Sequence, residues 1–228
     1  MKFTTHKVVT RDYAENLTGG VMVCGINFGF TKDEEKNEAS GIVQEAEVLS
    51  FFSDQTVNNT KFRNRVLKWL RSWKIDLNGQ PNKEGHLEKI YFQTNWIDSQ
   101  TRDVKSEGAI NNETLVKYSS GFLCLVEHRK PRIIVFVGSS LIQAFNDIRL
   151  RAGIEAVLGA RSGNAQILDI NADLYKGRRF KVFFQKFGET HILCLPHPQT
   201  RGLSDEYIAS LILPEVVHTK LMGRNDAQ

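Results

Sequence analysis

The residues best suited to do chemistry lie in two short loops, each of which follows an apolar run. The loops read VMVCGINFGF over residues 21–30 and ILCLPHPQTRGLS over residues 192–204. The first offers the amide of Asn27 between Gly25 and Gly29, and the second offers the imidazole of His197 and the guanidinium of Arg201. Ligands of open α/β sheets bind beyond the carboxyl ends of the strands, where such loops meet. We therefore predict that the two loops face each other across a binding site.

The elements that would position these loops alternate along the chain. Apolar runs predict strands at Val21–Ile26, Lys89–Trp96, Ile133–Val137 and Ile192–Leu195. Helical spacing of apolar residues predicts helices over 61–74, 113–129, 141–151 and 205–217, and Lys130-Pro131 is a helix stop signal. Two further segments, 165–170 and 180–187, predict an antiparallel hairpin or a sheet edge.

This alternation of strands and helices predicts an α/β fold. We expect a single-domain, three-layer α/β/α architecture with a central, mostly parallel sheet. The domain would span residues 1–228, with 1–20 as a lead-in or edge element and 218–228 as a loose tail. In the helix over 61–74, Trp69 and Trp73 share the apolar face, which favours the core over base stacking, and the opposite face is basic.

Composition excludes several classes of protein. The chain has 228 residues, 41% of them hydrophobic and 25% charged, which is ordinary globular composition. The formal charge of +4 permits a polyanionic partner without demanding one. An odd number of cysteines without a close pair (Cys24, Cys124 and Cys194) argues against a disulfide framework or a metal cluster and favours buried free thiols.

No stretch has the length or composition of a signal peptide or a membrane span. We therefore expect an intracellular protein, cytoplasmic or nuclear, that makes no membrane contact. We also expect it to be a monomer and to need neither a metal nor a cofactor.

Four segments, taken in order, resemble the uracil-DNA glycosylase superfamily. GINFG at 25–29 is similar to the family's strand-end G-x-N-P-G motif, found in its mismatch-specific and single-strand-selective branches. HPQTR at 197–201 is similar to its H-P-S-P motif, and Asn95 stands at a strand end where the family places a base-reading asparagine. KPRIIVFVG at 130–138 is similar to the family's lysine-proline, strand and glycine run. The order and spacing fit over roughly residues 20–215.

The resemblance implies a monofunctional DNA glycosylase that flips a uracil-like, deaminated or modified base out of the stack and hydrolyses its N-glycosidic bond. Asn27 would position the attacking water, and His197 would stabilise the charge that builds on the base oxygen. The remaining base-binding residues would wall the pocket, stack on the base or read its edge; they are Gly25, Ile26, Phe28, Phe30 and Asn95. Neither motif contains a lysine that could form a Schiff base, so no lyase step is expected.

Two departures from the family pattern leave the identity of the base open. Phe28 replaces the usual proline of the first motif, and Gln199-Thr200 replaces the usual serine-proline of the second. In the family, both motifs line the base pocket or contact the adjoining DNA backbone, so these changes bear on which base is accepted.

The same resemblance suggests how single- or double-stranded DNA would be held. Ser139 and Ser140, at a helix start, would bind a phosphate through their backbone N–H groups. Arg201 or Leu203 would enter the gap that the flipped base leaves. As structural alternatives, Ser140 is a helix cap and Arg201 belongs to an ordinary surface loop.

Each site residue also has a structural explanation. Asn27 suits a turn, Asn95 can cap a strand end, and His197-Pro198 can form a rigid exit from the sheet. Phe28 and Phe30 can be core aromatics. If Phe28 filled the pocket, the chain would be a catalytically silent module that binds DNA or a nucleotide. An unrelated α/β hydrolase or nucleotide-binding enzyme is less favoured because G-x-S-x-G, P-loop and G-x-G-x-x-G motifs are absent from the sequence.

Overall fold

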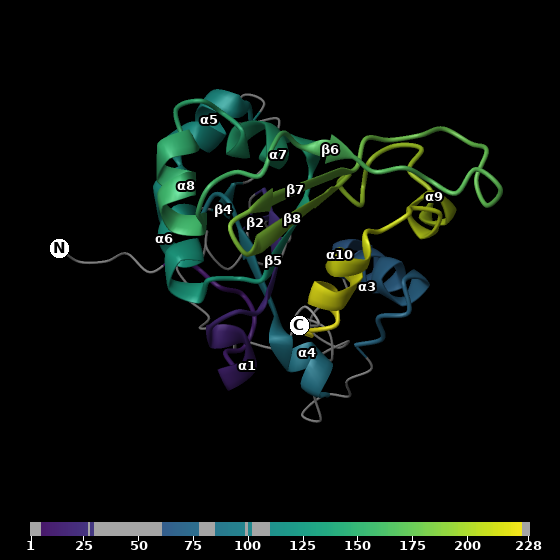
Figure 1. The fold of residues 1–228 in the computed structure, drawn as a ribbon, viewed down its shortest axis with the longest axis horizontal. Coiled ribbons are helices and arrows are strands. Elements are labelled where there is room, and N and C mark those ends of the chain that lie inside the picture. Colours follow the sequence, from purple (N-terminus) through teal and green to yellow (C-terminus); the bar gives the residue numbers. More distant parts are fainter. Residues whose placement is uncertain are drawn as a thin grey trace, which may run out of the picture.

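The four predicted core strands pair side by side in the computed structural model (Figure 1). The structure describes residues 6–26, 28–29, 61–77, 85–98, 100–101 and 110–224. Strand β1 (Val21–Gly25) pairs in parallel with β3 (Tyr91–Asn95) on one side and with β5 (Ile133–Val137) on the other. β5 pairs in parallel with β8 (Thr190–Leu195). The predicted parallel core of an α/β fold is confirmed.

The sheet continues beyond β8 with antiparallel strands. β7 (Phe183–Phe187) pairs antiparallel with β8, and β6 (Gln166–Ile167) pairs antiparallel with β7. The order of the six-stranded sheet among the described residues is therefore β3-β1-β5-β8-β7-β6. The predicted hairpin at the sheet edge is confirmed, with shorter strands than expected. A separate short parallel pair joins β2 (Phe28–Gly29) to β4 (Gln100–Thr101).

Helices cover both faces of the sheet and make the protein three-layered (Figure 1). One face packs against α3 (Lys61–Ser72), α9 (Asp205–Ala209) and α10 (Glu215–Leu221). The other packs against α5 (Asn112–Lys117), α6 (Ser119–Arg129), α7 (Ser139–Phe145) and α8 (Arg151–Leu158). The central strands β1 and β5 are buried along their whole length, as expected for parallel strands covered on both sides.

An aromatic cluster forms the core beneath α6 and α7. Trp96 stacks on Phe122 with ring centroids 4.4 Å apart, and Phe136 and Phe145 contact both rings. On the opposite face, Trp69 and Trp73 are 1% and 7% exposed, so their predicted place in the core is confirmed. Cys24 and Cys194 are buried and unpaired, and burial raises the pKa of the Cys194 thiol to about 12. Cys124 is only partly buried.

Several predicted helices are broken where the sequence pattern suggested one element. The helix expected over 113–129 is interrupted at Tyr118, which separates α5 from α6. The helix expected over 141–151 begins earlier, at Ser139, and ends at Phe145 before α8 starts. The helix expected over 205–217 is split into α9 and α10 by a segment containing Pro214, whose ring has no N–H to continue a helix.

Parts of both terminal segments form regular structure. The lead-in contains α1 (Ala14–Leu17), and Val8 forms an antiparallel bridge to Thr94 of β3. Residues 218–221 belong to α10 rather than to a loose tail. The strand expected from Lys89 begins at Tyr91, because α4 (His86–Ile90) occupies the preceding residues. No helix in the described ranges is long and apolar enough to cross a membrane.

We predict that Phe122→Ala lowers the free energy of unfolding by about 3–5 kcal/mol, because it leaves a cavity beside Trp96 that the packed rings cannot fill. Urea denaturation of both proteins measures the difference. Ile148→Ala is the matched control: this side chain is 77% exposed, and its loss is expected to cost less than about 0.5 kcal/mol. Equal effects of the two substitutions would contradict the assigned core.

Candidate functional site

The carboxyl ends of the parallel strands meet at one edge of the sheet. Backbone hydrogen bonds extend the pairing to this edge: the Trp96 N–H donates to the Gly25 carbonyl, and the Gly138 N–H donates to the Leu195 carbonyl, both at 2.9 Å. The segments that follow the four strands are therefore neighbours. This arrangement brings Ile26, which follows β1, to the same edge as the chain that follows β8.

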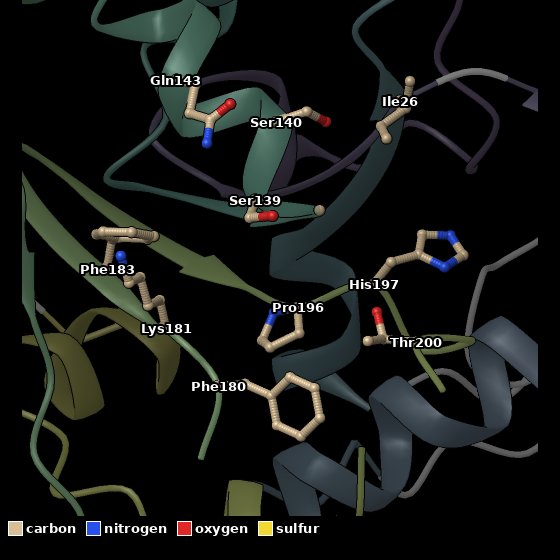
Figure 2. A pocket seen from close by; sticks show the side chains of 11 residues that line it. Ile26, Ser139, Ser140, Gln143, Phe180, Lys181, Phe183, Pro196, His197 and Thr200 are labelled. Carbon is tan, nitrogen blue, oxygen red and sulfur yellow. The ribbon is translucent and has the colours of Figure 1, made fainter. Parts of the chain in front are cut away.

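A cavity of about 440 Å³ opens at this edge. Figure 2 shows Ser139 and Ser140 of α7 across from His197 on the loop after β8, with Ile26 beside them. The lining comes from four segments: Ile26; Gly138, Ser139, Ser140 and Gln143; Phe180, Lys181 and Phe183; Pro196, His197 and Thr200. Its size lies in the range of small-molecule sites, about 300–1,000 Å³.

The local geometry favours one neutral tautomer of His197. The backbone N–H of Gln199 donates to its Nδ1 atom at 3.2 Å, which makes Nδ1 an acceptor. In the neutral ring the proton then resides on Nε2, which is left as a donor. Burial lowers the pKa of His197, so the ring is neutral at pH 7. The Phe62 ring of α3 lies 6.0 Å from the imidazole, between centroids.

Helix α3 holds the loop that carries His197. The guanidinium of Arg65 donates hydrogen bonds to the carbonyls of Pro198 and Leu203, at the two ends of the turn. The same side chain pairs with Asp205, its Nε atom lying 2.8 Å from Oδ1. One arginine thereby fixes the path of the chain between β8 and α9.

Asp205 is the other half of this anchor. It accepts a hydrogen bond from the Trp69 indole at 2.8 Å and pairs with Lys68 at 2.8 Å, in addition to Arg65. Partial burial raises the pKa of Asp205, but its bonds to Arg65, Lys68 and Trp69 outweigh this effect and lower the pKa to about 2. The basic face of α3 is thus partly neutralised by Asp205.

Asn95 lies one strand away from the cavity. It pairs in register with Gly25, and an ideal Cβ built on Gly25 would lie 2.2 Å from the Asn95 Oδ1 atom. The amide therefore occupies the space that only a glycine leaves open. Asn95 is 5% exposed, and no described residue forms a hydrogen bond with its amide. His6 fixes the Asn95 backbone, its Nε2 atom lying 2.6 Å from the carbonyl oxygen.

Not every predicted site residue is brought to the cavity. Ile26, Ser139, Ser140 and His197 line it together, whereas Gly25 and Asn95 lie beside one another at the paired ends of β1 and β3. Asn27 and Phe30 lie outside the described residues, and for Phe28 only the backbone in β2 is described. Of the two predicted loops, the first therefore contributes Ile26 to the cavity and the second contributes His197.

Leu203 corrects one prediction. Its side chain is 6% exposed and belongs to the core that packs against α3 and α9, so it cannot enter a gap in DNA without leaving that core. Its turn stays closed through the Leu203 N–H, which donates to the Thr200 carbonyl at 3.2 Å. Arg201, at the tip of the turn, is exposed and remains available.

No protein-family model matches the chain, and no curated sequence is significantly similar to it.

Sequence reasoning missed several residues of this site. Phe180 and Lys181 line the cavity although they come from the segment before the edge strand β7. Arg65 and Asp205 were not predicted because they are far apart in sequence, and either charge alone suits a solvated surface. A usable signal existed for Asp205: an acidic residue directly after Ser204 indicates a capped helix start, and the Ser204 hydroxyl accepts a bond from the Tyr207 N–H.

We predict that Asp205→Asn destabilises the protein in a pH-dependent way. The folded-state pKa of about 2 lies below the unfolded value of about 3.9, so the carboxylate stabilises the fold above pH 4 and loses this effect as the pH falls towards 2. We expect a loss of about 1 kcal/mol at pH 7 that shrinks by pH 3. Denaturation at both pH values measures it. Asp76→Asn, at an exposed ion pair, is the control.

A second prediction concerns Gly25→Ala. Its new methyl group would overlap the Asn95 amide, and because Asn95 is buried, the strand ends must shift. We expect a loss of about 1–3 kcal/mol in unfolding free energy. Gly153→Ala on α8 is the matched control: an added Cβ there meets only Leu123 at 3.5 Å, and the higher helix propensity of alanine stabilises the helix. Stabilisation by both substitutions would contradict the close contact.

Proposed function

We propose that the chain is a monofunctional DNA glycosylase that hydrolyses the N-glycosidic bond of a uracil-like, deaminated or otherwise modified base. The observation that carries the proposal is the neutral His197 on the rim of a cavity at the carboxyl edge of the sheet, with an Nε2–H that has no hydrogen-bond acceptor among the described residues. The order of the glycine-asparagine, asparagine, lysine-proline and histidine-proline segments supports the same reading. A DNA substrate would place the enzyme in the cytoplasm or nucleus.

The geometry around His197 suits a base that leaves as an anion. When the bond between C1′ and the base nitrogen breaks, the electron pair departs with the base and negative charge gathers on its carbonyl oxygen. A neutral Nε2–H donor, fixed by the Gln199 bond to Nδ1, stabilises that oxygen without having to release a proton. Since burial keeps the imidazole neutral, this role does not need an imidazolium.

Asn27 would direct the water that completes the reaction. It follows Ile26, which lines the cavity. Its amide oxygen can accept a hydrogen bond from water but cannot take the proton as a strong base would. Bond breaking would therefore run ahead of water attack, through an oxocarbenium-like sugar. The water oxygen then bonds to C1′, and its proton passes to the departing base, which yields a free base and an abasic site.

Recognition of the base would fall to the apolar walls and to Asn95. Asn95 lies one strand away from the cavity lining, so the base would have to extend past Ile26 towards the end of β3. An amide donates and accepts at once, so Asn95 can match a carbonyl and an adjacent N–H on a pyrimidine edge. Its amide is without a partner among the described residues, which is consistent with a group reserved for a ligand. Phe28 and Phe30 stay predicted stacking partners. Ser139 and Ser140, whose N–H groups begin α7, would contact a phosphate.

The decisive experiment is an excision assay on labelled oligonucleotides that carry uracil, hypoxanthine, xanthine or modified pyrimidines, followed by heat or alkali to cut abasic sites. We predict cleavage by the native chain, and a loss of about 10²–10³ in rate for His197→Ala, the cost of removing one donor to a developing anion. Asn27→Ala is expected to lose activity as well.

His128→Ala and Asn164→Ala are the matched controls, because both residues are exposed and lie outside the lining of the cavity. They should cleave like the native chain. Cleavage that survives in the His197 and Asn27 variants would reject the assigned roles. DNA binding without cleavage of any substrate would instead favour a catalytically silent DNA-binding module.

A further inference from the structure

A cluster of cations lies on the segment between β6 and β7, which Figure 1 shows in green as a long excursion next to α9. The cations are all exposed and fall within six residues: Lys176, Arg178, Arg179 and Lys181. We call residues 176–181 the basic arm. Six residues reach at most about 20 Å, the axial rise of roughly six base pairs.

The basic arm is held in place by aromatic contacts with α9. The rings of Tyr175 and Phe180 pack edge-on against Tyr207, with centroids 5.3 and 5.7 Å apart. The Tyr207 hydroxyl donates a hydrogen bond to the Phe180 carbonyl, and the Tyr175 hydroxyl donates to the Arg178 carbonyl at 2.9 Å. Tyr207 is 1% exposed, so the arm is anchored to the core.

This anchoring orders the backbone of the arm while its charges face solvent. The Arg178 guanidinium carbon lies 5.0 Å from the centre of the Phe180 ring, which orients that side chain. Lys176 and Arg179 are exposed and form no ion pair with any described residue. The cations are thus presented on an ordered turn, and binding them costs less conformational entropy than binding a disordered tail would.

The cations of the arm differ from those of α3 in having no ion-pair partner among the described residues. In the part of the chain that the structure describes, none of its four cations takes part in an ion pair. This differs from Arg65 and Lys68, which both pair with Asp205. Clustered like charges repel one another, and such a cluster is the electrostatic footprint of a polyanionic partner.

The arm also adjoins the proposed active site. Phe180 and Lys181 line the cavity that contains His197 (Figure 2). An ideal Cβ on Gly202 would lie 3.7 Å from the Arg178 Nη1 atom, so the arm lies against the turn that carries the exposed Arg201. Cations from two loops therefore converge on one side of the cavity.

We infer that the basic arm binds the phosphate backbone of DNA beside the nucleotide that enters the cavity; this rests on the proposed function. Regularly spaced phosphates match several cations presented along a turn, whereas one small anion would engage only one or two. Each phosphate that the arm neutralises releases counterions, so the arm would supply sequence-independent affinity. Base choice would remain with the cavity.

The test compares Arg178→Gln/Arg179→Gln with a control that removes the same charge, Lys89→Gln/Arg224→Gln. Lys89 precedes β3, and Arg224 follows α10, so the control residues lie away from the cavity lining. Binding to an undamaged 20-base-pair duplex is measured by fluorescence anisotropy over a range of salt concentrations. We expect the arm variant to bind about tenfold or more weakly and its salt slope to fall by about 1.8, or 0.9 for each lost phosphate contact.

Each outcome decides the inference. Native-like binding and slope in the arm variant, with an unchanged thermal unfolding midpoint, would overturn it, as would equal losses in the control variant. No DNA binding by the native chain would overturn it too, and poly-glutamate binding that depends on the arm would then identify an acidic protein as the partner. Excision is measured separately. DNA binding that depends on the arm, without excision of any base, would reject the glycosylase activity and support DNA binding by the arm. Excision by a chain whose DNA binding does not depend on the arm would support the activity and reject the role of the arm.

Discussion

The parallel register of β1 with its two neighbours is the constraint on which the rest of the structure depends. β1 pairs with β3 and β5 at once, and its four side chains from Val21 to Cys24 are at most 2% exposed. Its backbone bonds are shared between two neighbours, so the strand has no open edge. Because parallel strands end at the same side of the sheet, the chain segments that follow them are delivered to one edge.

The sheet alone does not fix the shape of the site; a charge network does. The chain after β8 must reverse from the sheet edge to α9, and its carbonyls at Pro198 and Leu203 are held by Arg65. Asp205 keeps that guanidinium in place and in turn needs it, because a partly buried carboxylate without a partner is costly. The position of His197 thus depends on α3, a helix that precedes β8 by more than a hundred residues in the sequence and packs against one face of the sheet.

The core strands could be predicted from the sequence for a physical reason, and so could the sheet edge at which Ile26 and His197 line a cavity. Strands buried on both faces must be continuously apolar, and Val21–Gly25 and Ile133–Val137 are. Their polar ends then stand out. Helix ends were less predictable because they depend on packing. The break at Tyr118 lies within an unbroken amphipathic pattern, so the sequence gives no sign of it. The break before α10 does have a sign in the sequence, because Pro214 cannot continue a helix. Leu203 was misjudged since one apolar residue in a loop has no periodicity that shows which way it points.

The distribution of charge around the cavity explains why the net charge was uninformative. A formal charge of +4 says little, because cations at this edge are of two kinds. Arg65 and Lys68 are bound to Asp205 and serve the fold, while the cations of the basic arm have no such partner among the described residues. His197 lies between these groups, and burial lowers its pKa. Burial disfavours the charged imidazolium, so the uncharged ring is the favoured form of His197 at this edge of the sheet.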